Sequence, residues 1–167
     1  SSVVFRMQSD PTTLVKGSDE AFQRLLLRFS EAAAGGMDDV ALIDLFCQTT
    51  REFFQVSGSY FWQLVGPNEL RGAAADGVMA EKILGYRLTN QMPSVVLETV
   101  QSRRTLYVNY LDPDKYPLAG EFGTRAILAA PLVVCNEVIG ATAFLHDADP
   151  GFFNDDLAAK ATILAGQ

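Results

Sequence analysis

The sequence contains little of what metal and redox sites usually need: one histidine and two cysteines in 167 residues. A zinc or iron–sulfur site built from nitrogen and sulfur ligands is therefore not expected. The two cysteines, Cys47 and Cys135, lie far apart in the chain and have no CxxC spacing, so they do not form a disulfide framework. We expect both to be reduced thiols in a cytoplasmic protein.

The chain also lacks an excess of positive charge, since 13 Lys and Arg residues stand against 20 Asp and Glu, for a net charge of -7. A protein whose main partner is nucleic acid needs a basic face, so no nucleic-acid partner is expected. No apolar run approaches the roughly 20 residues that span a bilayer. Nor does a basic segment followed by an apolar one mark a secretory signal. We therefore expect no membrane insertion.

Three common catalytic signatures are also missing: the GxSxG elbow of hydrolases, the GxxxxGK[ST] phosphate loop and the HExxH zinc motif. The single histidine, His146, has no serine or cysteine close to it in sequence, so a hydrolytic triad is not proposed. We therefore expect that the protein is not an enzyme.

What the chain does contain is an ordinary globular composition, 49% hydrophobic and 20% charged, at a length that suits one domain. Residues 1–17 lack sustained periodicity and are expected to be an N-terminal extension or linker, with a single domain over 18–167. Ser18 is the expected N-cap of a first helix. An apolar stripe at helical spacing follows it: Phe22, Leu25, Leu26 and Phe29. A second helix, apolar enough to pack on two sides, is expected from Asp38 or Asp39 to about Gln55.

The pattern changes after Gly58. SYFWQLV has the aromatic and β-branched content of a strand, and a Gly-Pro-Asn turn leads into a second strand, ELRGAAAD. GVMAEKILG is either a short helix or a loop, a helix is expected to begin at Pro93, and TLYVN is a short strand. DPDKYPLAGEFG is a loop with one helical turn. A last helix begins after Asn154, and we expect it to continue beyond Gln167.

Two further strands flank Cys135 in the stretch RAILAAPLVVCNEVIGATAFLHD, which has small residues where a core usually has bulky ones. Alternate residues of a strand share a face. Two sets therefore face opposite ways: Ala126, Leu128 and Ala130 on one side, and Arg125, Ile127 and Ala129 on the other. The small residues either leave room for a ligand or let a helix approach closely. For Gly140 and Ala141 we favour the helix; for 125–130 both interpretations stay open.

Strands that come mostly as hairpins indicate an α+β fold, with a central antiparallel sheet of about five to six strands and helices on its faces. The C-terminal half resembles the corresponding part of GAF domains. The resemblance rests on Ala-Ala-Pro-Leu at 129–132, Glu-Val-Ile-Gly at 137–140, Phe-Leu at 144–145 and Phe-Phe-Asn-Asp-Asp-Leu at 152–157. In order and spacing it extends over about residues 19–167.

The resemblance implies that the terminal helices pack on one face of the sheet, often forming a homodimer interface. The other face holds a small-molecule pocket covered by a helix and the 109–124 loop. GAF domains report ligand occupancy to an effector domain on the same polypeptide, such as a histidine kinase. The expected pocket rim is GYRL, MPSVV, LYVNYLDPDKY and EFGTR, in which aromatic rings and placed charges suit a ligand site. We take these residues as candidate ligand contacts: Tyr107, Asp112, Tyr116, Phe122, Arg125 and Ile127.

The sequence does not identify the ligand. Cyclic-nucleotide-binding GAF domains share an Asn-Lys pair after the last strand, where this chain has His146-Asp147. Neither cysteine lies where bilin-carrying members attach their chromophore. The sulfoxide reductase built on this fold depends on clustered reactive cysteines, which Cys47 and Cys135 are not. Two functions remain open: a small-molecule sensor that signals through its terminal helices, or a ligand-free dimerisation and relay module whose own side chains fill the pocket.

Overall fold

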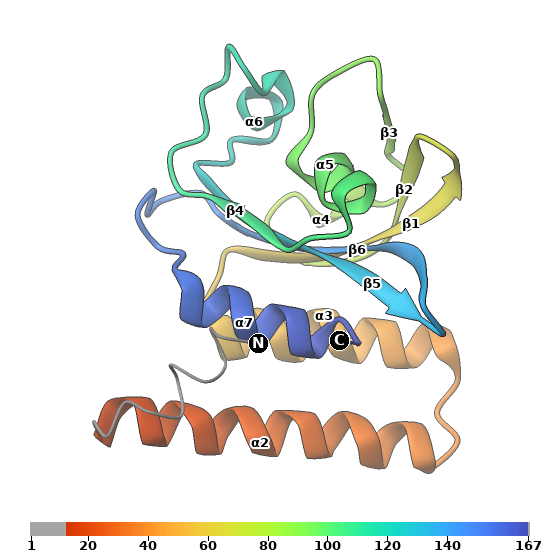
Figure 1. Ribbon diagram of the computed structural model, residues 1–167, viewed down its shortest axis with the longest axis vertical. Helices are drawn as coiled ribbons and strands as arrows, with labels where there is room; N and C mark the ends of the chain where they lie inside the picture. Colours follow the sequence, from red (N-terminus) through yellow and green to blue (C-terminus); the bar gives the residue numbers. More distant parts are fainter. Residues whose placement is uncertain (1–12, 167) are drawn as a thin grey trace.

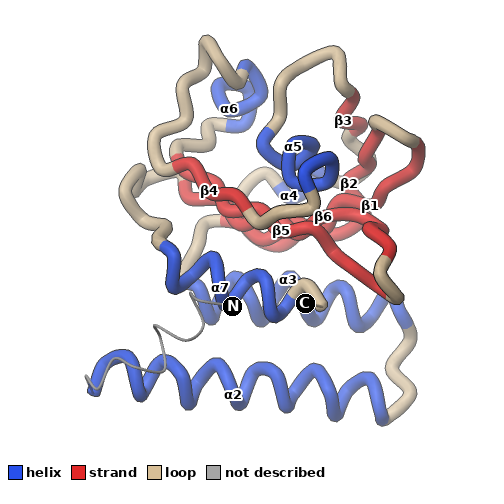
Figure 2. Tube along the Cα trace, viewed as in Figure 1, coloured by secondary structure: helices blue, strands red, loops and turns tan. Residues whose placement is uncertain are grey.

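The computed structural model describes the backbone of residues 13–166 and the side chains of residues 19–166. Its helices are α2 (Thr13–Ala34), α3 (Asp39–Phe54), α4 (Ala80–Ile83), α5 (Val95–Ser102), α6 (Pro117–Phe122) and α7 (Asp155–Leu164). Its strands are β1 (Gly58–Gly66), β2 (Glu69–Gly77), β3 (Arg87–Thr89), β4 (Leu106–Val108), β5 (Ala126–Val134) and β6 (Glu137–His146). The expected α+β fold is confirmed (Figures 1 and 2).

The described strands form one antiparallel sheet in the order β3-β2-β1-β6-β5-β4. The β5–β6 hairpin turns at Cys135 and Asn136, whose φ angles of 52° and 66° are those that a tight hairpin turn requires. The central pair, β1 and β6, joins segments far apart in sequence. The sequence did not predict β3, because its three residues are too few to show a strand period.

Helices cover the two faces of the sheet in separate groups (Figure 1). On one face α3 packs against β1 and β2, α7 packs against β5, and α2 packs on α3 from outside. On the other face lie α4, α5 and α6. The apolar helix α3 therefore lies between α2 and the sheet, which confirms that it packs on two sides. The group formed by α2, α3 and α7 is called the terminal-helix layer below.

Alternation along β5 divides the core between these faces. Ala126, Leu128 and Ala130 belong to the cluster formed with the terminal-helix layer. Ile127 and Ala129 belong to the cluster on the opposite face. The predicted orientation of the strand is confirmed, and the small residues at 126 and 130 serve helix packing.

Gly140 corrects one expectation about close packing. A Cβ at this position would lie 2.1 Å from the carbonyl oxygen of Trp62, so the close neighbour is the backbone of β1 and not a helix. The sequence showed the small residue but not which element approaches it. Ala141 lies in the cluster on which α5 packs, as expected.

Two predicted helix beginnings need correction. Helix α2 already includes Thr13, so Ser18 lies within it and is not its N-cap; one glycine, Gly17, does not stop the helix. Helix α5 begins one residue after its N-cap Ser94, whose Oγ accepts from the Leu97 N–H at 3.4 Å, so Pro93 precedes the cap. Helix α7 ends at Leu164, because Gly166 adopts a φ of 97° and ends it as a C-terminal glycine. Continuation of the helix past Gln167 lies outside the described residues and stays a prediction. An attached effector domain stays a prediction.

Candidate ligand-binding site

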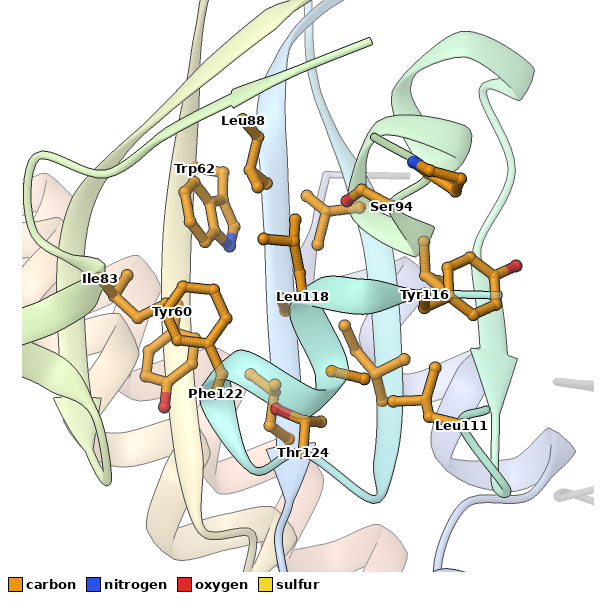
Figure 3. A pocket seen from close by; sticks show the side chains of 17 residues that line it. Tyr60, Trp62, Ile83, Leu88, Ser94, Leu111, Tyr116, Leu118, Phe122 and Thr124 are labelled. Atoms are coloured by element: carbon orange, nitrogen blue, oxygen red, sulfur yellow. The ribbon is translucent and has the colours of Figure 1, made fainter. Parts of the chain in front are cut away.

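A cavity of about 60 Å³ lies on the face of the sheet opposite the terminal-helix layer (Figure 3). Strands β1, β5 and β6 provide one wall: Tyr60, Trp62, Ile127, Ala143 and Leu145. The segment 111–122, which includes α6, provides another, and we call it the cover: Leu111, Tyr116, Leu118, Ala119 and Phe122 line the cavity from it. The N-terminus of α5 closes a third side. The sheet thus forms the floor of the cavity, beneath a cover that is half loop and half α6.

The walls of the cavity are uncharged and mostly apolar, with Ser94 and Thr124 as polar residues. Among the described residues that line it, none carries a charged side chain. The hydroxyl groups of its two tyrosines turn away from it: Tyr60 donates to the Val78 carbonyl, and Tyr116 donates to the Glu98 carboxylate at 3.3 Å. Burial, followed by the charge of Glu98, raises the pKa of Tyr116 above its ordinary value. Tyr116 therefore stays a neutral donor.

Trp62 differs from the two tyrosines, because the polar group of its side chain has no partner in the part of the chain that the structure describes. Its side chain is 3% exposed, and within the described residues its Nε1 has no hydrogen-bond partner. Figure 3 shows the indole nitrogen on the side of the ring that faces the cavity. Buried donors in folded proteins are nearly always paired, so this N–H is a polar feature of the site that the chain leaves unused.

Weak surface interactions and apolar packing hold the cover in place. Glu121 on α6 forms an ion pair with Lys82, with 3.5 Å between Lys82 Nζ and Glu121 Oε1. Both side chains are about 40% exposed. The ring of Phe122 lies 5.1 Å from that of Tyr86 in an edge-to-face contact. An exposed ion pair contributes roughly 0–1 kcal/mol, so the cover depends mainly on the burial of Tyr116 and Ala119, with Leu118 and Phe122 packed partly buried beside them.

Asn109 connects the start of the cover to the terminal-helix layer. Its Nδ2 donates to the Phe153 carbonyl at 2.8 Å, and its Oδ1 accepts from the Phe153 N–H at 2.8 Å. Phe153 lies just before the Asn154 cap of α7 and belongs to the core under that layer. Two residues before Asn109, in β4, Tyr107 makes a second connection: its hydroxyl donates to Asp155 Oδ1 at 2.9 Å. Two side chains therefore fix the chain before the cover to the beginning of α7.

The structure brings together three of the six predicted ligand contacts. Tyr116, Phe122 and Ile127 line the cavity. Tyr107 lies on the other face, packed against the core under α7. Asp112 is exposed and its Oδ1 accepts from the Asp114 N–H at 2.9 Å, which makes it a turn residue. Arg125 is exposed just before β5 and is not among the residues of the cavity.

Tyr60 and Trp62 are the important wall residues that the sequence did not single out. A signal was present, because alternation in SYFWQLV puts these two rings on one face of β1. Which face of β1 meets the cavity depends on the pairing of β1 with β6, and no local pattern reveals it. The predicted rim stretches GYRL and MPSVV do reach the cavity, through Leu88 and residues 93–96.

The cysteines and the histidine lie away from the cavity. Cys47 is buried in α3, and burial, followed by the charges of Asp44 and Asp76, raises its pKa to about 12. Cys135 is exposed in the β5–β6 turn. His146 accepts backbone N–H groups of Ala148 and Asp149 at its Nδ1, at 3.3 and 3.1 Å, so it organises the loop after β6.

The chain belongs to the GAF domain family, whose model matches residues 40–167. The match begins within α3, so it leaves out α2, which the resemblance in the sequence had included. GAF domains are regulatory and sensor domains. A comparison with curated proteins finds no match. Within residues 13–166, none of the helices combines the length and the apolar character needed to cross a membrane.

Three solved structures illustrate the range of proteins with this fold. The GAF domain of a phosphoenolpyruvate-protein phosphotransferase from Coxiella burnetii has a TM-score of 0.74 and 14% identity, over 87% of this chain and 88% of that one. The phycocyanobilin-bound GAF domain of a cyanobacterial phytochrome has a TM-score of 0.69 and 12% identity, over 86% and 92%. Free methionine-R-sulfoxide reductase from Neisseria meningitidis, in complex with its substrate, has a TM-score of 0.70 and 20% identity, over 86% and 83%. At these identities the likeness concerns the fold alone.

Proposed function

We propose that this GAF domain is a small-molecule sensor, with the ligand bound in the cavity between the sheet and the cover. The observation that carries the proposal is the cavity itself: it lies beneath a loosely held segment, on the face opposite the terminal-helix layer. Ligand pockets commonly combine apolar walls with a few placed polar groups, and Trp62 Nε1 is such a group here. Pockets for drug-sized ligands hold roughly 300–1,000 Å³, so the cavity as it stands suits a small ligand, and a larger one requires the cover to move outward.

The connection through Asn109 supports a route for the signal. A ligand that shifts the cover acts on the segment that Asn109 fixes to Phe153, and so on the beginning of α7. Lys160 on α7 in turn pairs with Asp19 on α2 at 3.5 Å, so α7 and α2 are linked. The ligand shifts this equilibrium only by the difference in its affinity for the two arrangements.

The wider context is part of the same proposal. The effector is a domain on the same polypeptide, of the histidine-kinase type, and the protein is cytoplasmic. It forms a homodimer through the terminal-helix layer, which is supported by exposed apolar side chains there: Leu27 on α2 is 57% exposed and Val40 on α3 is 72% exposed.

We also propose that the domain is not an enzyme, although a reductase shares its fold. A thiol reacts as its thiolate, and the raised pKa of buried Cys47 keeps this thiol protonated at neutral pH. Cys135, in the turn at the far end of the hairpin, is not among the residues of the cavity.

The alternative is a ligand-free relay and dimerisation module. The small volume and uncharged walls of the cavity favour it, since side chains already fill most of the pocket. An empty apolar cavity of about 60 Å³ costs on the order of 1–2 kcal/mol, which a folded domain tolerates.

A thermal-shift screen with metabolites, combined with native mass spectrometry of the purified chain, tests the proposal. A ligand present at 100 times its Kd adds about 2.7 kcal/mol, or roughly 5–10 °C in Tm. Ile127→Phe, which fills the cavity, should abolish the shift. Arg125→Ala, outside the cavity, should leave it unchanged. If nothing copurifies and no compound raises Tm, the relay function is the better account.

A further inference from the structure

The nature of the ligand follows from the group that the cavity leaves unsatisfied. An indole N–H is a donor only, so its partner must be an acceptor. Trp62 is 3% exposed, and within the described residues no acceptor lies within hydrogen-bond distance of its Nε1. Because this N–H faces the cavity, a molecule bound in the cavity could supply the acceptor that the chain does not.

The neighbouring tyrosine hydroxyls do not supply the missing acceptor, and the Ser94 and Thr124 hydroxyls, which also line the cavity, make no hydrogen bond to Trp62 Nε1. The Tyr60 hydroxyl is engaged with the Val78 carbonyl, and the Tyr116 hydroxyl with Glu98. The Tyr86 ring packs edge-to-face on Trp62 at 6.4 Å, and its hydroxyl is directed to Glu121 at 3.3 Å. Each of these tyrosine oxygens is held by a contact outside the cavity, so none is available to turn towards Trp62.

The walls restrict the rest of the ligand. The lining residues carry no charge, so an ionised ligand would lose its hydration without gaining a counterion, which is strongly unfavourable. This argues against phosphates and carboxylates and, with them, against cyclic nucleotides. The volume of about 60 Å³ favours a small molecule with few polar groups.

We propose that the sensor binds a small, neutral, largely apolar molecule whose single oxygen acceptor, such as a carbonyl, accepts a hydrogen bond from Trp62 Nε1. This inference rests on the proposed sensor function, because it assumes that the cavity is a ligand site. It goes beyond that function by naming the chemical class of the ligand and the residue that selects it.

A matched pair of probes tests the inference on the whole 167-residue chain. Cyclopentanone and methylenecyclopentane have nearly the same shape, but only the ketone carries an acceptor. Trp62 is the chain's one tryptophan, so its indole N–H gives a single signal in a ¹⁵N–¹H correlation spectrum. We expect the ketone to bind more tightly, by about 2- to 10-fold for one hydrogen bond, and to move this signal downfield. The hydrocarbon should not move it downfield.

Trp62→Phe provides the matched variant, since it keeps an aromatic ring and removes the donor. It should weaken the ketone to the affinity of the hydrocarbon and leave the hydrocarbon unchanged. The comparison of the two probes on the unmodified chain does not depend on whether this variant folds. Equal binding of both probes would overturn the inference while leaving the cavity as a ligand site; a water already bound to Trp62 would give this result. If neither probe binds, the inference is overturned as well, and the metabolite screen alone then decides the proposed sensor function.

Discussion

At the scale of single residues, Gly140 and Trp62 show how closely the sheet is packed behind the cavity. A Cβ on Gly140 would lie 2.1 Å from the Trp62 carbonyl oxygen, within the paired backbones of β6 and β1. Neither backbone can move without disturbing the sheet. The absence of a side chain at 140 therefore allows the backbone of β1 to approach β6 closely at Trp62, a residue of the cavity wall.

Gly140→Ala should destabilise the domain by about 1–3 kcal/mol, because an added methyl group in a fully packed site forces backbone shifts. Urea denaturation measures this change. Gly120→Ala is the control, since its Cβ would lie 3.5 Å from that of Pro113, an ordinary contact, within α6. A helical Gly→Ala change is expected to stabilise by up to about 1 kcal/mol. Equal effects of the two variants would contradict the account of Gly140.

The two cysteines should differ sharply in reactivity. Burial raises the pKa of Cys47 to about 12, so at pH 8 almost all of this thiol stays protonated and enclosed. Cys135 is exposed. A thiol-specific dye at pH 8 should label one site in the native protein and two in denaturant. Rapid labelling of Cys47 in the native state would show that α3 opens more easily than the structure indicates.

At the scale of elements, the sequence predicted most helices and strands because their signals are local. Aromatic and β-branched residues marked β1, and the cap Asn154, whose Oδ1 accepts from the Leu157 N–H at 2.9 Å, marked α7. The terminal glycine Gly166 was overlooked, although its sequence signal was present. Strand β3 was missed because a three-residue strand has no period of its own.

The ligand contacts were harder to predict because they depend on how the cover folds over the sheet. Tyr116 and Phe122 turn inward as the cover closes, whereas Asp112 stays outside as a turn residue. Tyr107 lies on the opposite face of the sheet, since β4 pairs with β5 in a register that sequence alone does not specify. Local pattern predicted the segment that forms the site but not the direction of each side chain.

Asn109 is expected to stabilise the contact between the segment after β4 and the beginning of α7, although its side chain is only half-buried. Asn109→Ala removes two hydrogen bonds to Phe153 and leaves a partly buried backbone N–H and C=O unpaired. The expected loss is about 1–3 kcal/mol, with faster hydrogen exchange around residues 153–157. Gln101→Ala, which removes the exposed bond to Asn68, is the control and should change stability by less than about 0.5 kcal/mol. Unchanged exchange near Phe153 in the Asn109 variant would refute the link.

Lys160 should join α7 to α2 through both its volume and its charge. Its side chain is fully buried, and it lies 2.8 Å from Asp156, 3.5 Å from Asp19 and 5.8 Å from the ring centre of Phe22. Lys160→Ala should cost about 2–4 kcal/mol because it leaves a cavity, whereas Lys160→Met keeps the volume and should cost less. Both should speed hydrogen exchange in α2. If Met is as costly as Ala in urea denaturation, charge rather than volume dominates.

At the scale of the whole molecule, the sheet separates the cavity from the terminal-helix layer. One face carries the small cavity and the cover. On the other face lie α3 and α7, with α2 packed on α3 from outside (Figure 1). The path between them runs around the edge of the sheet at β4, through Asn109 and Tyr107 to the beginning of α7. A signal that follows this path need not deform the sheet.

The central claim is that filling the cavity changes the terminal-helix layer, and hydrogen exchange with and without a saturating cavity probe, cyclopentanone, tests it most directly. We expect slower exchange in the cover, residues 111–122, together with altered exchange at residues 153–157 at the beginning of α7. The Asn109→Ala variant should retain the first effect and lose the second. Protection confined to the cover in the unmodified chain would contradict the account, because the ligand would then bind without reaching the helices.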